Sequence, residues 1–182
     1  MNKIKNLPNY ITALRIIGTL SLLFTEPFGK PFFIIYTLAG VTDVLDGAIA
    51  RKTKCTSEFG AKLDSAADLL FYAVMILKIF TKLLEKVVRP IWIAVSIIVA
   101  MRLAAYITAL VKYHCFASLH TYLNKLTGFS VFCTPYMYNT QYLNVFCVIL
   151  CTIAFLSSAE ELCVHFTRKN YRSNLKTIFE KE

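Results

Sequence analysis

The sequence is poor in charge, and acidic residues are the scarcest charged group. Only 17% of its 182 residues are charged, with 11 acidic residues against 20 basic ones, whereas soluble domains carry about 25% charged residues. Apolar residues make up 57% of the chain, and the mean hydropathy is +0.55. This composition excludes an ordinary soluble domain. We expect an all-α integral membrane protein.

Several other features are missing as well. The net charge of +9 is not arranged as a basic stripe interleaved with aromatics, so we expect no nucleic-acid partner. The six cysteines form no CxxC motif and no disulfide framework, so we expect reduced residues that serve packing. The three histidines lack metal-site spacing. No small-residue cleavage site follows the first apolar run, so we expect no cleavable signal peptide.

The apolar runs and the breaks between them predict six transmembrane helices in one domain, residues 1–182. Pro and Gly in "EPFGKP" end the first run. Ser57 and Glu58 are typical helix-start residues, and Pro90 falls in the first turn of the fourth predicted helix. The predicted spans are about 10–25, 31–51, 57–83, 88–112, 121–138 and 142–165, followed by a polar tail of about 167–182.

The distribution of Lys and Arg predicts the orientation in the membrane. If the N-terminus lies inside, the inner segments carry twelve Lys and Arg residues and the outer loops carry four. Because basic loops favour the cytoplasmic side, we expect both termini in the cytoplasm. Arg51 then marks the cytoplasmic end of the second predicted helix. The acidic residues around it are expected to line a polar cavity on that side.

Four aspartates lie around residues 43–68, within these apolar surroundings. Asp43 and Asp46 are spaced i, i+3, and Asp64 and Asp68 are spaced i, i+4, so each pair shares one helix face. Unpaired, the four carboxylates would repel one another and be costly to desolvate. Divalent cations relieve both costs, and oxygen ligands suit Mg²⁺ or Mn²⁺, as well as Ca²⁺. Four carboxylates suffice for a two-metal site for phosphoryl transfer. The alternative is a proton or ion path in a transporter.

Small residues accompany the acids. Gly47 and Ala50 lie on the face of the first pair, and Gly60 lies four residues before Asp64. They leave room for a ligand to approach the backbone, or they serve close helix packing. Arg51 supplies a cation suited to phosphate.

These residues resemble the signature of the CDP-alcohol phosphotransferase (CDP-alcohol phosphatidyltransferase) family. Every fixed position of that signature matches in the register Asp43-x2-Asp46-Gly47-x2-Ala50-Arg51-x8-Gly60-x3-Asp64-x3-Asp68. The stretch "LPNYITALR" is similar to the N-terminal element of the family, through Asn9, Thr12 and Arg15. The six-helix layout is also similar to that of the family.

The resemblance implies a transfer of a substituted phosphate from a CDP-linked donor to an alcohol, with release of CMP. It implies that Asp43, Asp46 and Asp64 are metal ligands, and that Asp68 is the general base, on or near the second of two ions. Gly47, Ala50 and Gly60 would shape the nucleotide pocket, and Arg51 would contact the donor. Asn9, Thr12 and Arg15 would lie near the diphosphate, although Arg15 could instead snorkel to the interface. The family also implies a homodimer in contact with membrane lipids.

The acceptor is less well specified by the sequence. The resemblance is to bacterial members of the family that are like phosphatidylglycerophosphate synthase, and it implies CDP-diacylglycerol as the donor. It also implies a location in a bacterial cell membrane. Arg102, inside the fourth predicted span, together with Lys112, His120 and Lys125, predicts a site for an acceptor that carries phosphate. Glycerol 3-phosphate is the expected acceptor. Serine and inositol phosphate are the alternative acceptors. Lys112 and Lys125 could instead be ordinary basic loop residues on the cytoplasmic side. For the whole protein, the alternative is a non-enzymatic transporter or scaffold.

Overall fold

The chain is mostly helical in the part that its computed structural model describes. That part comprises residues 7–53, 58–114, 121–167 and 177, with side chains described in these ranges except at 7–9, 43–53, 58–62, 64 and 65. No strand occurs within these ranges. The elements are α1 (Leu7–Ser21), the short 3-10 helix η1 (Leu22–Phe24), α2 (Lys30–Thr53), α3 (Glu58–Lys86), α4 (Arg89–Tyr113), α5 (Tyr122–Met137) and α6 (Leu143–Thr167).

The six α-helices agree with the six helical segments predicted from the sequence. Glu58 begins α3, and Pro90 lies in the first turn of α4, as expected. The polar tail beyond Thr167 falls outside the described residues, apart from residue 177. The helices divide into two compact units, residues 1–85 and 86–182, which we call the N-terminal unit and the C-terminal unit and describe separately.

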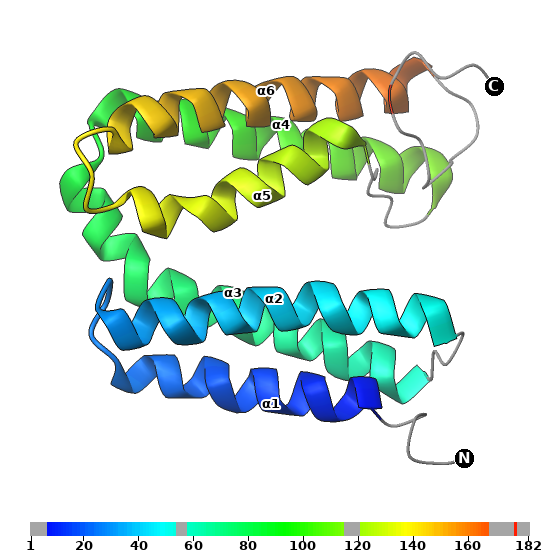
Figure 1. Cartoon of the computed structure of the whole chain (residues 1–182). Helices are drawn as coiled ribbons and strands as arrows, with labels where there is room; N and C mark the ends of the chain where they lie inside the picture. Colours follow the sequence, from blue (N-terminus) through cyan, green and yellow to red (C-terminus); the bar gives the residue numbers. More distant parts are fainter. Residues whose placement is uncertain (1–6, 54–57, 115–120, 168–176, 178–182) are drawn as a thin grey trace. The chain divides into compact units, whose positions relative to one another are not determined.

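In the N-terminal unit, α1 and α2 are joined by a short connection and lie side by side (Figure 1). Phe32, which is fully buried, stacks on Tyr36 with ring centroids 5.6 Å apart. Tyr36 also stacks on Phe71 of α3, again at 5.6 Å. Lys78 Nζ of α3 donates to the carbonyl of Thr25, at 2.6 Å. These contacts hold α3 against the pair formed by α1 and α2.

In the C-terminal unit, α4 and α6 run side by side, and α5 packs on α6 (Figure 1). Near the start of α4, the backbone N–H of Val88 donates to Asn144 Oδ1 at 3.2 Å. At the other end, α4 stops at His114, whose φ of 54° is left-handed and incompatible with continuing the helix. The Thr121 side chain caps α5 by accepting from the backbone N–H of Asn124 at 3.3 Å.

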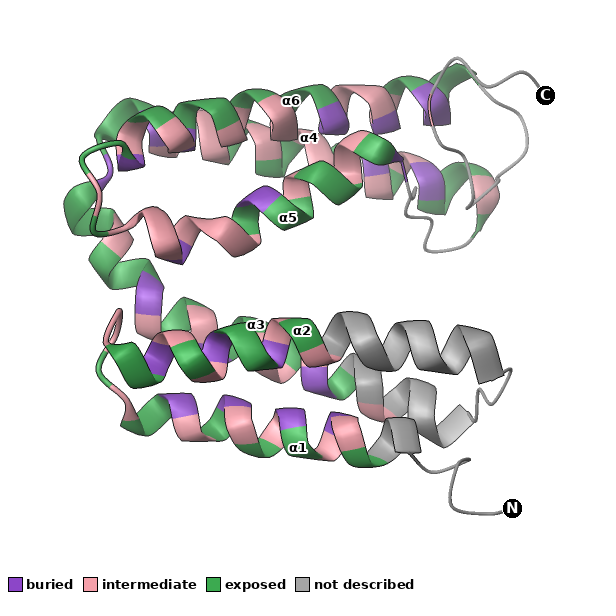
Figure 2. Cartoon of the chain, viewed as in Figure 1, coloured by how far each residue is buried: buried purple, intermediate pink, exposed green. Residues whose placement is uncertain are grey.

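The burial pattern places apolar side chains outside and several polar ones inside. Figure 2 shows the exposed faces of α4 and α6. Ser157, Ser158, Glu161 and His165 of α6 are each at most 2% exposed. The exposed faces of these two helices are instead apolar, through Ile93, Ile97, Val99, Leu103, Ile107, Val111, Val145, Val148, Ile149, Phe155 and Leu156. Soluble proteins rarely expose so large an apolar surface, so a membrane environment is indicated.

Two helices of the described part are long and apolar enough to cross a membrane, by length and composition. They are α4 and α6. The apolar stretches Tyr10–Phe24 and Lys30–Thr42 are shorter. The all-helical prediction is therefore confirmed, and a membrane protein is supported. Six membrane crossings and a polar cavity remain predictions.

Candidate functional site

The four signature aspartates lie on two helices of the N-terminal unit. Asp43 and Asp46 belong to α2, and Asp64 and Asp68 belong to α3. The backbone is helical at all four positions, so the i, i+3 and i, i+4 spacings apply as expected. The side chains of Asp43, Asp46 and Asp64 lie outside the described part. The same is true of the other predicted signature positions, Gly47, Ala50, Arg51 and Gly60.

Asp68 is the signature acid whose surroundings are described, and it lies beside Arg15. Arg15 Nη2 of α1 is 3.5 Å from Asp68 Oδ1 of α3. The Arg15 side chain is only 2% exposed, whereas that of Asp68 is 46% exposed. A snorkelling arginine would keep its charged head in water. The burial of Arg15 therefore favours the inward role near the site over snorkelling.

Arg15 is part of a buried polar stripe on α1. Thr12, Arg15 and Thr19 share one helix face through i, i+3 and i, i+7 spacing and are each at most 4% exposed. Apolar Leu14 and Ile17, on other faces, are 67% and 65% exposed. Asn9, the remaining predicted residue of this element, has its side chain outside the described part. The interior of the N-terminal unit is thus lined with polar groups from α1.

The oxygen atoms that the signature aspartates offer as ligands suit hard divalent cations. The four positions supply carboxylate oxygens, which are the ligands that Mg²⁺ and Mn²⁺ prefer. The buried, charged Arg15 beside Asp68 indicates that this interior accommodates charge. Among the described residues, no group of three His, Cys, Asp or Glu could hold a metal. The side chains of Asp43, Asp46 and Asp64, three of the four predicted ligands, do not belong to the described part.

Arg102 of α4, predicted to bind the acceptor, bridges the helices of the C-terminal unit. Its Nη1 donates to Glu161 Oε2 of α6 at 2.6 Å. Its Nη2 donates to Asn124 Oδ1 of α5. The Glu161 side chain is 3% exposed and that of Arg102 is 23% exposed. The charge inside the apolar α4 thus has a partner, and part of the Arg102 side chain remains exposed.

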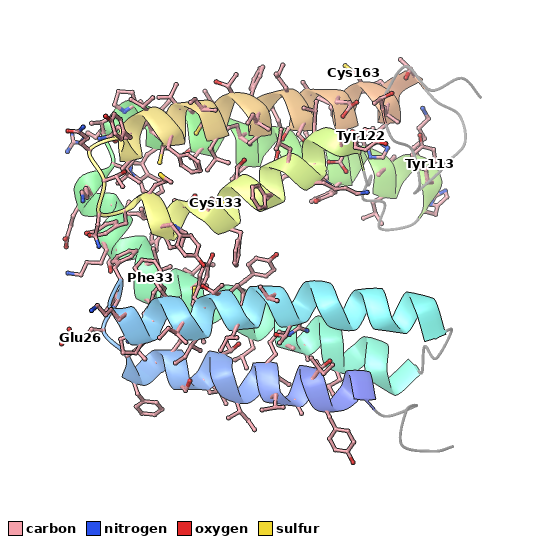
Figure 3. All side chains as sticks on the ribbon, in the orientation of Figure 1. Glu26, Phe33, Tyr113, Tyr122, Cys133 and Cys163 are labelled. Atoms are coloured by element: carbon pink, nitrogen blue, oxygen red, sulfur yellow. The ribbon has the colours of Figure 1, made fainter. Side chains whose placement is uncertain are left out.

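The other predicted acceptor residues have different surroundings. Lys112 Nζ donates to the carbonyls of His165 and Phe166, at 2.7 and 3.2 Å, and so binds the C-terminal end of α6. Lys125 is exposed, with its Nζ 6.0 Å from the centroid of the Tyr122 ring. Figure 3 shows Tyr122 at the end of the C-terminal unit that also carries Tyr113. His120 lies outside the described residues.

Glu161, Asn124 and His165 were not singled out from the sequence. Glu161 had a signal, because it is an acid inside the predicted span 142–165, where a charge calls for a partner. His165 is 1% exposed, and neither ring nitrogen has a hydrogen-bond partner among the described residues. Its ring centroid is 5.7 Å from that of Tyr113.

The described cysteines agree with the expectation of reduced residues. Cys133, Cys147, Cys151 and Cys163 are free thiols. Cys147 is buried, as packing residues are, whereas Cys163 is exposed on the last turns of α6 (Figure 3). Cys55 and Cys115 lie outside the described residues.

Curated relatives resemble the chain over part of its length. A protein of Rickettsia bellii named CDP-diacylglycerol–glycerol-3-phosphate 3-phosphatidyltransferase is 35% identical over 43% of this chain and 46% of its own length. A Haemophilus influenzae protein of the same name is 36% identical over 58% and 57%. A CDP-diacylglycerol–serine O-phosphatidyltransferase of Methanocaldococcus jannaschii is 41% identical over 41% and 34%. The matched region is thus about half, or less, of each relative.

The family comparison covers much more of the chain than these relatives do. No solved structure matches the chain. The family model described as CDP-alcohol phosphatidyltransferase matches residues 5–159, a range that includes the complete signature and reaches from α1 into α6. The resemblance inferred from the signature is confirmed: the chain belongs to the CDP-alcohol phosphatidyltransferase family.

Proposed function

We propose that the protein is a metal-dependent phosphatidyltransferase of phospholipid biosynthesis. It would move a phosphatidyl group from CDP-diacylglycerol to glycerol 3-phosphate and release CMP. Family membership and the names of the bacterial relatives support the reaction class and the substrates. The observation that carries the proposal is the buried Arg15 beside Asp68, the last acid of the signature.

In the proposed reaction, the acceptor hydroxyl oxygen attacks the phosphorus that bears the diacylglycerol. A new P–O bond forms, the P–O bond to CMP breaks, and CMP leaves with the bonding electron pair. Asp68, whose carboxylate is half-exposed, takes the proton of the attacking hydroxyl. Arg15 supplies positive charge 3.5 Å from that carboxylate.

Asp43, Asp46, Asp64 and Asp68 would hold two divalent ions, Mg²⁺ or Mn²⁺. When bound, such ions stabilise the charge of the diphosphate and of the leaving CMP. In the same proposal, Gly47, Ala50 and Gly60 leave space for the nucleotide, and Arg51 contacts the donor. Asn9 and Thr12 lie on α1 with Arg15 and are proposed to face the diphosphate.

For the acceptor, we propose Arg102 as the main ligand of the phosphate group. Its guanidinium suits a bidentate contact with phosphate, and it is partly exposed inside an otherwise apolar helix. Lys112, His120 and Lys125 are the additional basic candidates. Of these, Lys112 already binds the end of α6.

The proposed setting is a bacterial cell membrane. All six helices would cross it, both termini and the active site would be cytoplasmic, and the protein would form a homodimer. The apolar outer faces of α4 and α6 support the membrane location. A lipid-linked donor would keep its acyl chains in the bilayer, and the soluble acceptor would arrive from water.

A serine acceptor is the second candidate, because one relative is named a serine O-phosphatidyltransferase. An inositol phosphate acceptor is the third, because it also carries a phosphate. The test is CMP release by purified protein with CDP-diacylglycerol and Mg²⁺ or Mn²⁺, with each acceptor offered separately. Release with glycerol 3-phosphate alone is the expected result. Release with serine alone would keep the family reaction and refute the proposed acceptor.

A further inference from the structure

The Arg102 guanidinium is held from two sides by two other helices. Glu161 of α6 accepts from Nη1, and Asn124 of α5 accepts from Nη2. An arginine side chain has several rotatable bonds, and each fixed rotamer costs conformational entropy. Two hydrogen bonds from separate terminal nitrogens set both the position and the plane of the guanidinium.

Both partners of Arg102 are themselves fixed in place. Glu161 is 2% exposed, on the inner face of α6. Asn124 lies in the first turn of α5, where its backbone N–H donates to the hydroxyl oxygen of Thr121 at 3.3 Å. Thr121 is 2% exposed. The bonded group thus connects α4, α5 and α6 through a buried carboxylate and a side chain on the capped first turn of α5.

The guanidinium has capacity left for a ligand. Arginine has five N–H donors, and Glu161 and Asn124 are the hydrogen-bond partners of Arg102 among the described residues. The Arg102 side chain is 23% exposed, so it is not sealed inside the protein. An arginine needed only to neutralise Glu161 could be as buried as Glu161 itself.

We propose that Glu161 and Asn124 are positioning residues for the acceptor. They hold the Arg102 guanidinium so that its remaining N–H groups meet the phosphate of the acceptor in a fixed orientation. This inference rests on the proposed function, in which Arg102 binds that phosphate. It adds that the strength of acceptor binding depends on two residues that do not touch the acceptor.

The test separates the KM for glycerol 3-phosphate from the KM for CDP-diacylglycerol. Arg102→Ala, Glu161→Ala and Asn124→Ala are each expected to raise the acceptor KM about tenfold, since a hydrogen bond to a charged group is lost or misplaced. The donor KM is expected to stay within about twofold. Glu161→Gln keeps an oxygen that can accept from Arg102, so it should raise the acceptor KM less than Glu161→Ala does. Glu160→Gln is the matched control on the same helix.

Double variants show whether the positioning acts through Arg102. Arg102→Ala combined with Glu161→Ala, or with Asn124→Ala, should have an acceptor KM no higher than Arg102→Ala alone, because coupled residues are not additive. Additive increases would overturn the inference. If Glu161→Ala does not fold, the cycle with Asn124→Ala and the conservative Glu161→Gln decide the question.

Two failures are distinguishable. If Arg102→Ala leaves the acceptor KM unchanged, the proposed role of Arg102 in acceptor binding is wrong, and the inference falls with it. If Arg102→Ala raises the acceptor KM while the Glu161 and Asn124 variants behave like the wild type, the acceptor role stands and the positioning role is refuted. A merely structural ion pair would change thermal stability and leave the ratio of the two KM values unchanged.

Discussion

Arg15 Nη2 lies 3.5 Å from Asp68 Oδ1, and the arginine is buried while the aspartate is half-exposed. The pair joins the first helix of the chain to the helix that carries the last signature acid. A buried cation and a carboxylate at this distance attract each other electrostatically. The same carboxylate is 46% exposed, as its proposed role as the base for the acceptor hydroxyl requires. This arrangement connects the N-terminal element to the proposed chemistry.

Replacing Arg15 should therefore reduce turnover. We expect Arg15→Ala to lower kcat about 100-fold, in line with the loss of one preorganised charge at a reaction centre. Arg15→Lys should recover part of the rate, because it keeps the charge and loses the planar fork. The measurement is steady-state CMP release. Lys82→Ala, an exposed lysine on α3, is the control, and equal rates for Arg15→Ala and Lys82→Ala would contradict the assignment.

Asp68→Asn should separate chemistry from binding. Loss of a general base lowers kcat by about 10²- to 10⁴-fold, whereas the donor should still bind because the amide has nearly the same size. Donor binding can be measured by titration with CDP-diacylglycerol in detergent. A variant that turns over normally would show that the proton of the acceptor goes elsewhere.

Removal of divalent ions should abolish CMP release. Protein treated with EDTA is expected to be inactive, and Mg²⁺ or Mn²⁺ should restore the activity, because the four carboxylates are proposed to bind hard cations. Asp43→Asn and Asp64→Asn should raise the metal concentration for half-maximal activity by at least about tenfold. Full activity in the presence of EDTA would refute the metal site. An unchanged metal requirement in both variants would place the ions on other residues.

Lys112 should contribute to stability through the end of α6. Its ammonium donates to the carbonyls of His165 and Phe166, where a cation also favours the helix dipole. Lys112→Met should cost about 1 kcal/mol, which lowers the Tm by about 2–4 °C in a chain of this size. Lys125→Met, at an exposed lysine of the same unit, is the control for thermal unfolding in detergent. An unchanged Tm for Lys112→Met would show that these bonds add no net stability.

Much of the helical layout follows from the sequence, because it depends on local signals. Apolar runs, the Pro and Gly breaks and Pro90 predicted six helices close to those observed. Membrane crossing is a property of the chain in its lipid surroundings. Among the described residues, length and composition support α4 and α6 as spans. Helices α1 and α5, with 15 and 16 residues, are shorter than the roughly 20 residues that a span needs.

The signature residues were also accessible from the sequence, because their spacing is set by helical geometry. The partners of Arg102 were harder to find. Asn124 and Glu161 are 22 and 59 positions away, and no local spacing rule links three different helices. The acid inside an apolar span was a signal for Glu161, but its partner became identifiable only once α4 and α6 were seen to pack together.

In the proposed reaction, this protein transfers a phosphatidyl group to an acceptor hydroxyl, with Asp68 as the base. The most direct measurement follows radiolabelled glycerol 3-phosphate into organic-soluble lipid in the presence of CDP-diacylglycerol and Mg²⁺, for the wild type and Asp68→Asn. We expect the wild type to place as much label in lipid as it releases CMP, and Asp68→Asn to place almost none. CMP release without labelled lipid, or equal labelling by both proteins, would contradict it.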